Sequence, residues 1–123
     1  MRTKVSRQFF AVLACALFLH GIAFARGGRP GEVRASELPP QASQLLELIA
    51  RGGPFAFDRD GVVFGNRERA LPDRPRGYYH EYTVKTPGVR SRGARRIVCG
   101  GDPRSTRDCY YSDDHYQTFR LIR

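Results

Sequence analysis

The order of apolar and polar positions after residue 38 predicts one helix. Apolar residues recur at the spacing of one helical face at Leu45, Leu48 and Ile49. Pro39-Pro40 stands where a helix can open, and Gly52-Gly53 stands where one can end. We therefore predict a helix that begins at the two prolines and ends at the two glycines.

Beyond this helix the pattern is that of short strands separated by polar turns. The predicted strands cover residues 55–57, 62–64, 79–85, 95–99, 109–112 and 118–122. Turn-forming residues stand between them, as in Thr86-Pro87-Gly88 and Asp102-Pro103. One helix followed by several strands favours the α+β class, with the helix packed on a twisted antiparallel β-sheet.

The first 25 residues have the pattern of a cleaved signal peptide. A basic start precedes an apolar run over residues 9–25, which ends in Ala23-Phe24-Ala25. A membrane anchor is the alternative, but a spanning helix needs about 20 apolar residues, and His20 and Gly21 weaken the end of this run. A lipoprotein cleavage site at Cys15 is a weaker alternative still. We therefore expect cleavage after Ala25, secretion, and no membrane contact afterwards.

The rest of the chain reads as one small basic domain. Residues 26–37 are rich in Gly, Arg and Pro and predict a flexible leader, so the domain is expected over residues 38–123. The chain has 21 Lys and Arg against 12 Asp and Glu; removing the three basic residues of the signal peptide leaves 18 against 12, a net charge of +6. All of these but Lys85 are arginines, which suit bidentate contact with phosphate. A merely soluble basic surface has the same charge, so charge alone supports a polyanionic partner only weakly.

Two cysteines, Cys99 and Cys109, remain after signal cleavage. An even count in an exported chain predicts a disulfide between them. The bond would close a small loop of turn formers over residues 100–103. Two free thiols are the less favoured alternative.

Four side chains suggest a chemistry: Glu81, Arg92, Arg96 and His115. RNA carries its own nucleophile, the ribose 2′-hydroxyl. An enzyme that cleaves RNA therefore needs a base, positive charge for the phosphoryl oxygens and an acid for the departing 5′-oxygen. No set of His, Cys and carboxylate side chains has metal-ligand spacing, so we expect neither a metal nor a cofactor.

Five motifs lie in order between residues 38 and 122: LPPQASQLLELIARGGPF, DGVVFGNRE, LP, GYYHEYTVKTPGVRSRGARRI and YYSDDHYQTF. In this order and spacing they resemble the microbial guanyl-specific ribonucleases of the barnase and ribonuclease Sa type. The resemblance covers nearly all of the predicted domain. It implies the same fold as the pattern above, with an active site on the open face of the sheet.

The resemblance also implies a role for each of the four side chains. Glu81 matches the general base for the 2′-hydroxyl, and His115 matches the general acid for the leaving 5′-oxygen. Arg92 and Arg96 match the pair that holds the phosphoryl oxygens. The first step would yield a 2′,3′-cyclic phosphate, and the two proton carriers would exchange roles in its hydrolysis. His80 precedes the base, but successive strand residues face opposite ways, so we assign it no catalytic role.

Guanine recognition maps by resemblance to residues 62–68. Glu68 matches the carboxylate that accepts the N–H groups of guanine, and backbone N–H groups around Asn66 and Arg67 would bind the guanine oxygen. Phe64 and Tyr116 match the apolar and aromatic walls against the base. Gly65 departs from the family pattern, where a residue with a side chain is expected.

Taken singly, each of these residues has an ordinary structural explanation, such as a strand carboxylate, a surface histidine, a solvated run of arginines or a core phenylalanine. Together, in matching order, they favour a monomeric, secreted ribonuclease that acts on single-stranded RNA. A secreted RNA-binding protein without turnover and an antibacterial ribonuclease toxin are the alternatives, because fold does not fix function. The resemblance also makes a barstar-like inhibitor a candidate partner.

Overall fold

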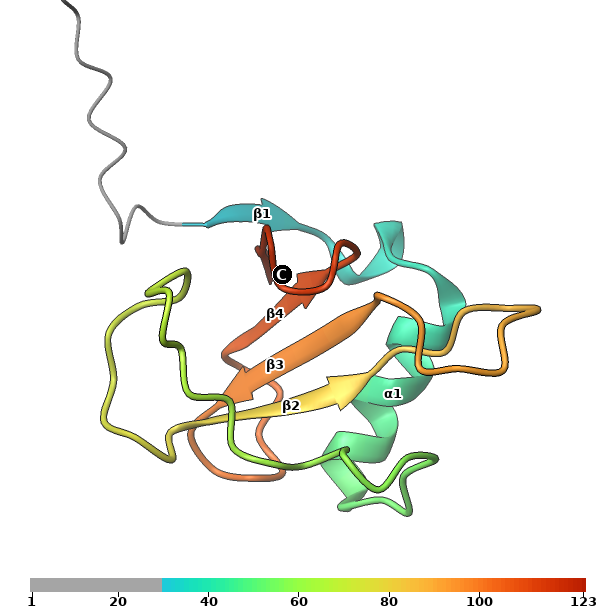
Figure 1. The fold of residues 1–123 in the computed structure, drawn as a ribbon, viewed down its shortest axis with the longest axis horizontal. Coiled ribbons are helices and arrows are strands. Elements are labelled where there is room, and N and C mark those ends of the chain that lie inside the picture. The colour runs from blue at the N-terminus through green and yellow to red at the C-terminus, as the bar shows by residue number, and fades with distance from the viewer. Residues whose placement is uncertain (1–29) are drawn as a thin grey trace, which may run out of the picture.

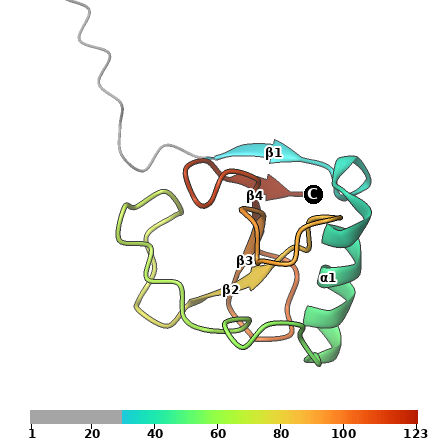
Figure 2. The ribbon, with the colours of Figure 1, turned by 45° about the vertical axis from the view of Figure 1, so that its right-hand side comes forward.

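The molecule is built on a five-stranded β-sheet with one α-helix across one of its faces (Figure 1). This computed structural model describes residues 30–123, so the predicted signal peptide lies outside the described residues. The elements in chain order are β1 (Gly31–Val33), the 3-10 helix η1 (Ala35–Glu37), α1 (Pro40–Arg51), β2 (Tyr79–Thr83), β3 (Arg96–Gly100), β4 (Cys109–Ser112) and β5 (Arg120–Ile122). Figure 1 and Figure 2 both show α1 on one side of the molecule and the yellow-green loop around residue 70 on the other.

The helix has the bounds that the sequence predicts. Proline occupies its first turn, where the missing N–H has no intrahelical partner to lose. It ends at Gly52, which adopts the left-handed conformation with φ 81°, and the N–H groups of Gly52 and Gly53 donate to Ile49 and Leu48. Glycine suits this end because it enters the left-handed region without a steric penalty.

The sheet has the order β1-β5-β4-β3-β2. Strands β2 to β5 pair antiparallel, as predicted, whereas β1 pairs parallel with β5 and makes the sheet mixed. The structure differs here from the flexible leader predicted over residues 26–37, because Gly31–Val33 forms an edge strand and Ala35–Glu37 a helical turn. The physical reason is the burial of Val33 in the core, a single apolar contact that leaves almost no periodic signal in the sequence.

Two predicted strands are not strands. Residues 62–64 run beside β2 through hydrogen bonds between backbone groups, but only the Val63–His80 bridge forms. Residues 55–57 form no strand; Phe55 instead packs its ring 5.1 Å from that of Tyr82. The turn between these segments is closed by Asp60, whose carboxylate accepts from backbone N–H groups at both residue 57 and residue 83.

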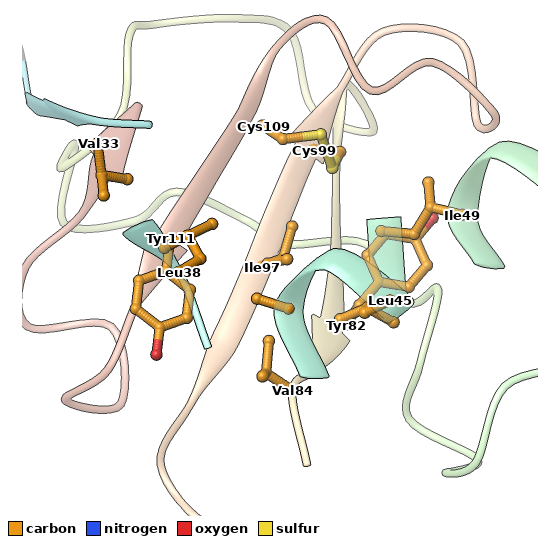
Figure 3. Close-up of a cluster of buried hydrophobic side chains, with 11 residues drawn as sticks. Val33, Leu38, Leu45, Ile49, Tyr82, Val84, Ile97, Cys99, Cys109 and Tyr111 are labelled. Carbon is orange, nitrogen blue, oxygen red and sulfur yellow. A yellow bond between two sulfur atoms is a disulfide. The ribbon is translucent and has the colours of Figure 1, made fainter. Parts of the chain in front are cut away.

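The strands alternate between a helix face and an open face of the sheet. The buried cluster on the helix face contains Val33, Leu38, Ala42, Leu45, Ile49, Tyr82, Val84, Ile97, Cys99, Cys109 and Tyr111 (Figure 3). On the open face a second cluster contains Leu71, Tyr79, Val98, Tyr110 and Phe119. Within residues 30–123 the open face carries no helix, and polar side chains at Glu81, Thr83, Arg96 and Ser112 also lie on it, so this is where a site can lie.

Cys99 and Cys109 form the predicted disulfide on the helix face (Figure 3). They are direct partners across the β3–β4 pair, with Cα atoms 4.1 Å apart. The bond closes the loop between these strands at a sequence separation of 10.

A disulfide that closes so short a loop should stabilise the protein by an amount near the low end of about 2–4 kcal/mol. We therefore expect a reducing agent to lower the free energy of unfolding of residues 26–123 by about 2 kcal/mol, measured by urea denaturation. The double variant Cys99→Ala/Cys109→Ala is the control and should not respond to the reductant. Titration of two reactive thiols in the unfolded, unreduced protein would contradict the prediction.

Candidate active site

The open face of the sheet presents a carboxylate and a guanidinium group on neighbouring strands. Glu81 of β2 lies opposite Val98 of β3, and two residues further along β2, Thr83 lies opposite Arg96. Both charged residues are buried, with 8% of Glu81 and 2% of Arg96 exposed. A buried charge must be compensated by partners, and the loops around this face supply them.

Arg92 reaches this face from the loop between β2 and β3. Its Nε donates to Thr83 Oγ1 at 2.9 Å, and its Nη2 lies 3.6 Å from Glu81 Oε1. Nη2 is buried, and among the described residues it has no hydrogen-bond partner. A buried donor without a hydrogen bond is costly, and the charge of the Glu81 carboxylate compensates for part of that cost.

Arg96 is held rigidly from both sides. Its Nη1 donates to the backbone carbonyls of Arg95 at 2.9 Å and Arg92 at 3.3 Å. Its Nε donates to the hydroxyl of Tyr116 at 3.0 Å, and its guanidinium carbon lies 5.6 Å from the centre of that ring. Burial and the Glu81 charge raise the pKa of the Tyr116 phenol, against the opposing effect of Arg96. The phenol therefore stays neutral and keeps the cation in place.

His115 lies in the loop that follows β4, on the rim of the same face. Its backbone N–H donates to the carbonyl of Ala94 at 2.9 Å, which ties this loop to the loop that carries Arg92. His115 and Tyr116 both have positive φ, 55° and 71°. Non-glycine residues in this region are uncommon and often belong to functional sites. The imidazole is exposed, with its centre 4.9 Å from that of the Tyr116 ring.

The conformation of the His115 loop is fixed by hydrogen bonds that the sequence analysis missed. Ser112 Oγ accepts from the N–H of Tyr116 at 3.0 Å and donates to Asp114 at 2.9 Å. Asp114 also accepts from the backbone N–H and the hydroxyl of Thr118. Burial acts to raise the pKa of the Asp114 carboxyl, but these hydrogen bonds outweigh it and lower the pKa below its usual value. The signal for this motif is the Ser-x-Asp-x-x-x-Thr spacing around the histidine, which is typical of side chains that bond nearby backbone.

A hollow of about 260 Å³, which we call the recognition hollow, opens beside these residues. Its lining contains Phe64, Gly65, Asn66, Arg67, Glu68, Ala70 and Tyr116. The rings of Phe64 and Tyr116 stack with centres 5.3 Å apart. A second hollow of about 450 Å³ shares Glu68, Ala70 and Tyr116 with it and adds His115 and Gln117. The predicted recognition residues and the predicted acid therefore line adjoining spaces.

The recognition loop, residues 64–78, is held in place by hydrogen bonds from one of its own side chains and from a side chain of β2. Asn66, at φ 49°, uses its side-chain amide to accept from the N–H of Leu71 and donate to the carbonyl of Leu71, both at 3.0 Å. Tyr79 of β2 donates its hydroxyl to the carbonyl of Pro72 at 2.7 Å. These bonds fix the backbone between Gly65 and Leu71 against the sheet, so the N–H groups of the loop have set directions.

The other predicted residues lie as their strand positions require. His80 pairs with Cys99, so alternation places it opposite to Glu81, as predicted. Among residues 30–123 there is no group of three or more His, Cys, Asp and Glu side chains arranged to hold a metal ion. No helix within the described part of the chain is long and apolar enough to cross a membrane.

Comparisons with known proteins show similarity to ribonucleases. A family model described as ribonuclease matches residues 24–123. Guanyl-specific ribonuclease Sa of Kitasatospora aureofaciens is 56% identical over 92 residues, which is 75% of this chain and 93% of that protein. Guanyl-specific ribonuclease St of Saccharopolyspora erythraea is 52% identical over 90 residues, which is 73% of this chain and 85% of that protein.

Solved structures of ribonuclease Sa2 are also similar to this chain. A structure of ribonuclease Sa2 complexes with mononucleotides matches with a TM-score of 0.71 and 50% identity, over 76% of this chain and 94% of that one. A crystal structure of ribonuclease Sa2 with guanosine-2'-cyclophosphate matches with a TM-score of 0.69 and 50% identity, over 76% of this chain and 96% of that one.

The buried phenol that pins the recognition loop predicts a loss of stability at high pH. Burial, helped by the Asp108 charge, raises the pKa of Tyr79 from 10.0 to about 12. Because the folded protein holds this proton more tightly than the unfolded chain does, the contribution of Tyr79 to stability is constant below pH 10 and is lost as the pH rises to about 12. The stability of the wild type should therefore fall more steeply over this window than that of Tyr79→Phe, measured by urea denaturation. Parallel curves for the two proteins would contradict the assignment.

Proposed function

The chain belongs to the ribonuclease family, and on that premise we propose that it is a guanine-preferring endoribonuclease that cleaves single-stranded RNA through a 2′,3′-cyclic phosphate. The name of a relative that is 56% identical supports the base preference. The cyclic nucleotide bound in a related structure supports the cyclic product. The proposal assigns each step to a side chain of the site described above.

In the first step Glu81 accepts the proton of the ribose 2′-hydroxyl, and the 2′-oxygen forms a bond to phosphorus. The bond between phosphorus and the 5′-oxygen breaks, and His115 gives its proton to that oxygen. In the second step water opens the cyclic phosphate, with His115 as base and Glu81 as acid. The exposed rim position of His115 suits this role, because its imidazole is accessible to a nucleotide that leaves the site.

The observation that carries the proposal is the arrangement of the two guanidinium groups. Arg96 is buried and held by its partners, which include the backbone carbonyl of Arg92, and Nη2 of Arg92 lies 3.6 Å from the proposed base. A phosphoryl group bound at this face would lie beside both cations. It would also meet fixed positive charge where negative charge grows in the transition state, which is an efficient form of catalysis.

Guanine would be read in the recognition hollow. Glu68 lies on the border between this hollow and the one lined by His115, so a base that it binds places its ribose toward the catalytic groups. The carboxylate accepts the N1–H and exocyclic N–H groups of guanine, which adenine does not present together. Backbone N–H groups around Asn66 and Arg67 face the guanine oxygen, and the Phe64–Tyr116 stack provides an aromatic surface for the base.

We also propose that the enzyme is secreted and acts as a monomer without a metal. Export rests on the sequence pattern of residues 1–25, and metal independence rests on a base, an acid and two cations that suffice for the reaction. A barstar-like protein is a candidate inhibitor.

Two variants should affect guanine recognition and catalysis separately. Glu68→Ala removes a charged acceptor for guanine and should cost about 1.5–3 kcal/mol of transition-state binding, for guanine substrates only. Glu81→Gln keeps the shape but removes the base, and should slow every dinucleotide by about 10²–10⁴-fold. The measurement is kcat/KM on GpC and ApC. An intact guanine preference in Glu68→Ala would refute the recognition role, and near-normal rates in Glu81→Gln would refute the base.

Cleavage should survive removal of divalent metals. With excess chelator, RNA should still be cut to a 2′,3′-cyclic phosphate, DNA should stay intact, and the rate should follow a bell against pH because a deprotonated base and a protonated acid are needed together. Complete loss of activity in chelator, or cleavage of DNA, would mean that the mechanism is wrong.

Export should remove the first 25 residues. Mass spectrometry of protein from the culture medium should show an N-terminus at Arg26. An N-terminus at Met1, or a lipid on Cys15, would refute cleavage after Ala25.

A further inference from the structure

Two guanidinium groups converge over Gly65 at the rim of the recognition hollow. A Cβ atom placed on Gly65 would lie 3.7 Å from Nε of Arg67 and 4.0 Å from Nη1 of Arg76. The two arginines stand at opposite ends of the loop, so their approach is a product of the fold. Both are exposed, and neither forms an ion pair within residues 30–123.

Two nearby arginines each have a partner. Arg74 of the same loop lies over the ring of Tyr78, 5.1 Å from its centre, and Arg92 faces Glu81. Arg67 and Arg76, in contrast, both lie within 4.0 Å of the same built Cβ position and form no ion pair within residues 30–123. Like charges repel, so an anion bound between the two groups would relieve the repulsion, and guanidinium groups bind phosphate oxygens particularly well.

The position of this pair relates it to one part of the RNA. The recognition hollow shares Glu68, Ala70 and Tyr116 with the space that contains His115, whereas Gly65 and Arg67 line only the part away from His115. The phosphate on the 3′ side of the bound guanosine must lie at the catalytic groups. The phosphate on the 5′ side leaves the opposite end of the ribose, and we assign it to the Gly65 rim because that rim is basic and does not border the space that contains His115.

We propose that Arg67 and Arg76 form a subsite for the phosphate on the 5′ side of the recognised guanosine, an inference that rests on the proposed function. The enzyme thereby favours a guanosine inside or at the phosphorylated start of a strand over one with a free 5′-hydroxyl. Gly65 contributes to this subsite. Its φ lies outside the left-handed region, so the backbone does not require glycine, but a side chain there would occupy the space into which the two guanidinium groups extend.

Arg76 is the residue to replace in the test. It lies outside the recognition hollow and forms no ion pair within residues 30–123, so its replacement removes no ion pair from the folded protein. The substrates are GpC, pGpC and GpCp, which differ only in the position of one added phosphate. The wild type should cleave pGpC with a kcat/KM about 3- to 10-fold above that for GpC at low salt, an advantage suited to two exposed charge contacts. Salt should reduce this advantage.

Arg76→Ala should bring the ratio of pGpC to GpC close to one, and Arg76→Glu should bring it below one. Both variants should cleave GpC and GpCp as the wild type does. Arg51→Ala is the matched control, because it removes the same charge at the exposed end of α1 on the other side of the molecule and should keep the full ratio (Figure 1).

An unchanged ratio in Arg76→Ala, or no advantage of pGpC in the wild type, would overturn the subsite. A loss confined to GpCp would overturn its placement on the 5′ side. These results differ from a failure of the proposed function, which would appear as a wild type that does not cleave GpC or cleaves ApC equally well.

Discussion

The buried guanidinium of Arg96 is the constraint on which the site depends. A charge with 2% exposure must be compensated almost entirely by protein groups. The two backbone carbonyls that accept from it come from the loop before β3, and the hydroxyl comes from Tyr116 in the loop after β4. One cation therefore fixes two loops at once, and these loops carry Arg92 and His115. Loss of the Arg96 side chain would therefore remove a charge and also release both loops.

The same constraint explains why, within residues 30–123, a helix covers one face of the sheet only. On the helix face, residues such as Tyr82 and Ile97 pack against α1, and the disulfide closes the end of the β3–β4 pair. On the open face, Glu81, Thr83 and Arg96 occupy the alternate positions of the same strands. A helix laid on this face would bury more charge than the local partners can compensate. The open face therefore stays available to a polyanion, while the helix face supplies the stability.

The sequence predicts well what depends on periodicity and poorly what depends on single contacts. The Leu45 and Ile49 face and the glycine end define the helix, and the bounds agree with the structure. Strand β1 was missed because its only buried residue is Val33, and the predicted strand at residues 62–64 is reduced to one bridge because its neighbours leave the sheet to form the recognition loop.

For the site, motif order selected residues that the fold places around one face of the sheet, but it could not give the conformation of their loops. The bond from Arg92 to Thr83 and the positive φ of His115 come from long-range contacts that no local pattern encodes. The same is true of Arg76. In the sequence it is one arginine in a basic loop, and only the fold brings it to the rim at Gly65.

The recognition loop and the catalytic face are held by different sets of contacts, and Tyr116 links them. Asn66 and Tyr79 pin the loop through Leu71 and Pro72, whereas the catalytic groups are fixed through Arg96. Tyr116 is the residue common to both, since it stacks on Phe64 and binds Arg96 through its hydroxyl. A base that stacks on this ring would therefore contact a residue that also holds Arg96, the proposed phosphate-binding cation. On the proposed mechanism, correct seating of guanine would favour the catalytic geometry, whereas changes at the outer rim, such as at Arg76, would alter which strands bind and leave the chemistry of the bond unchanged.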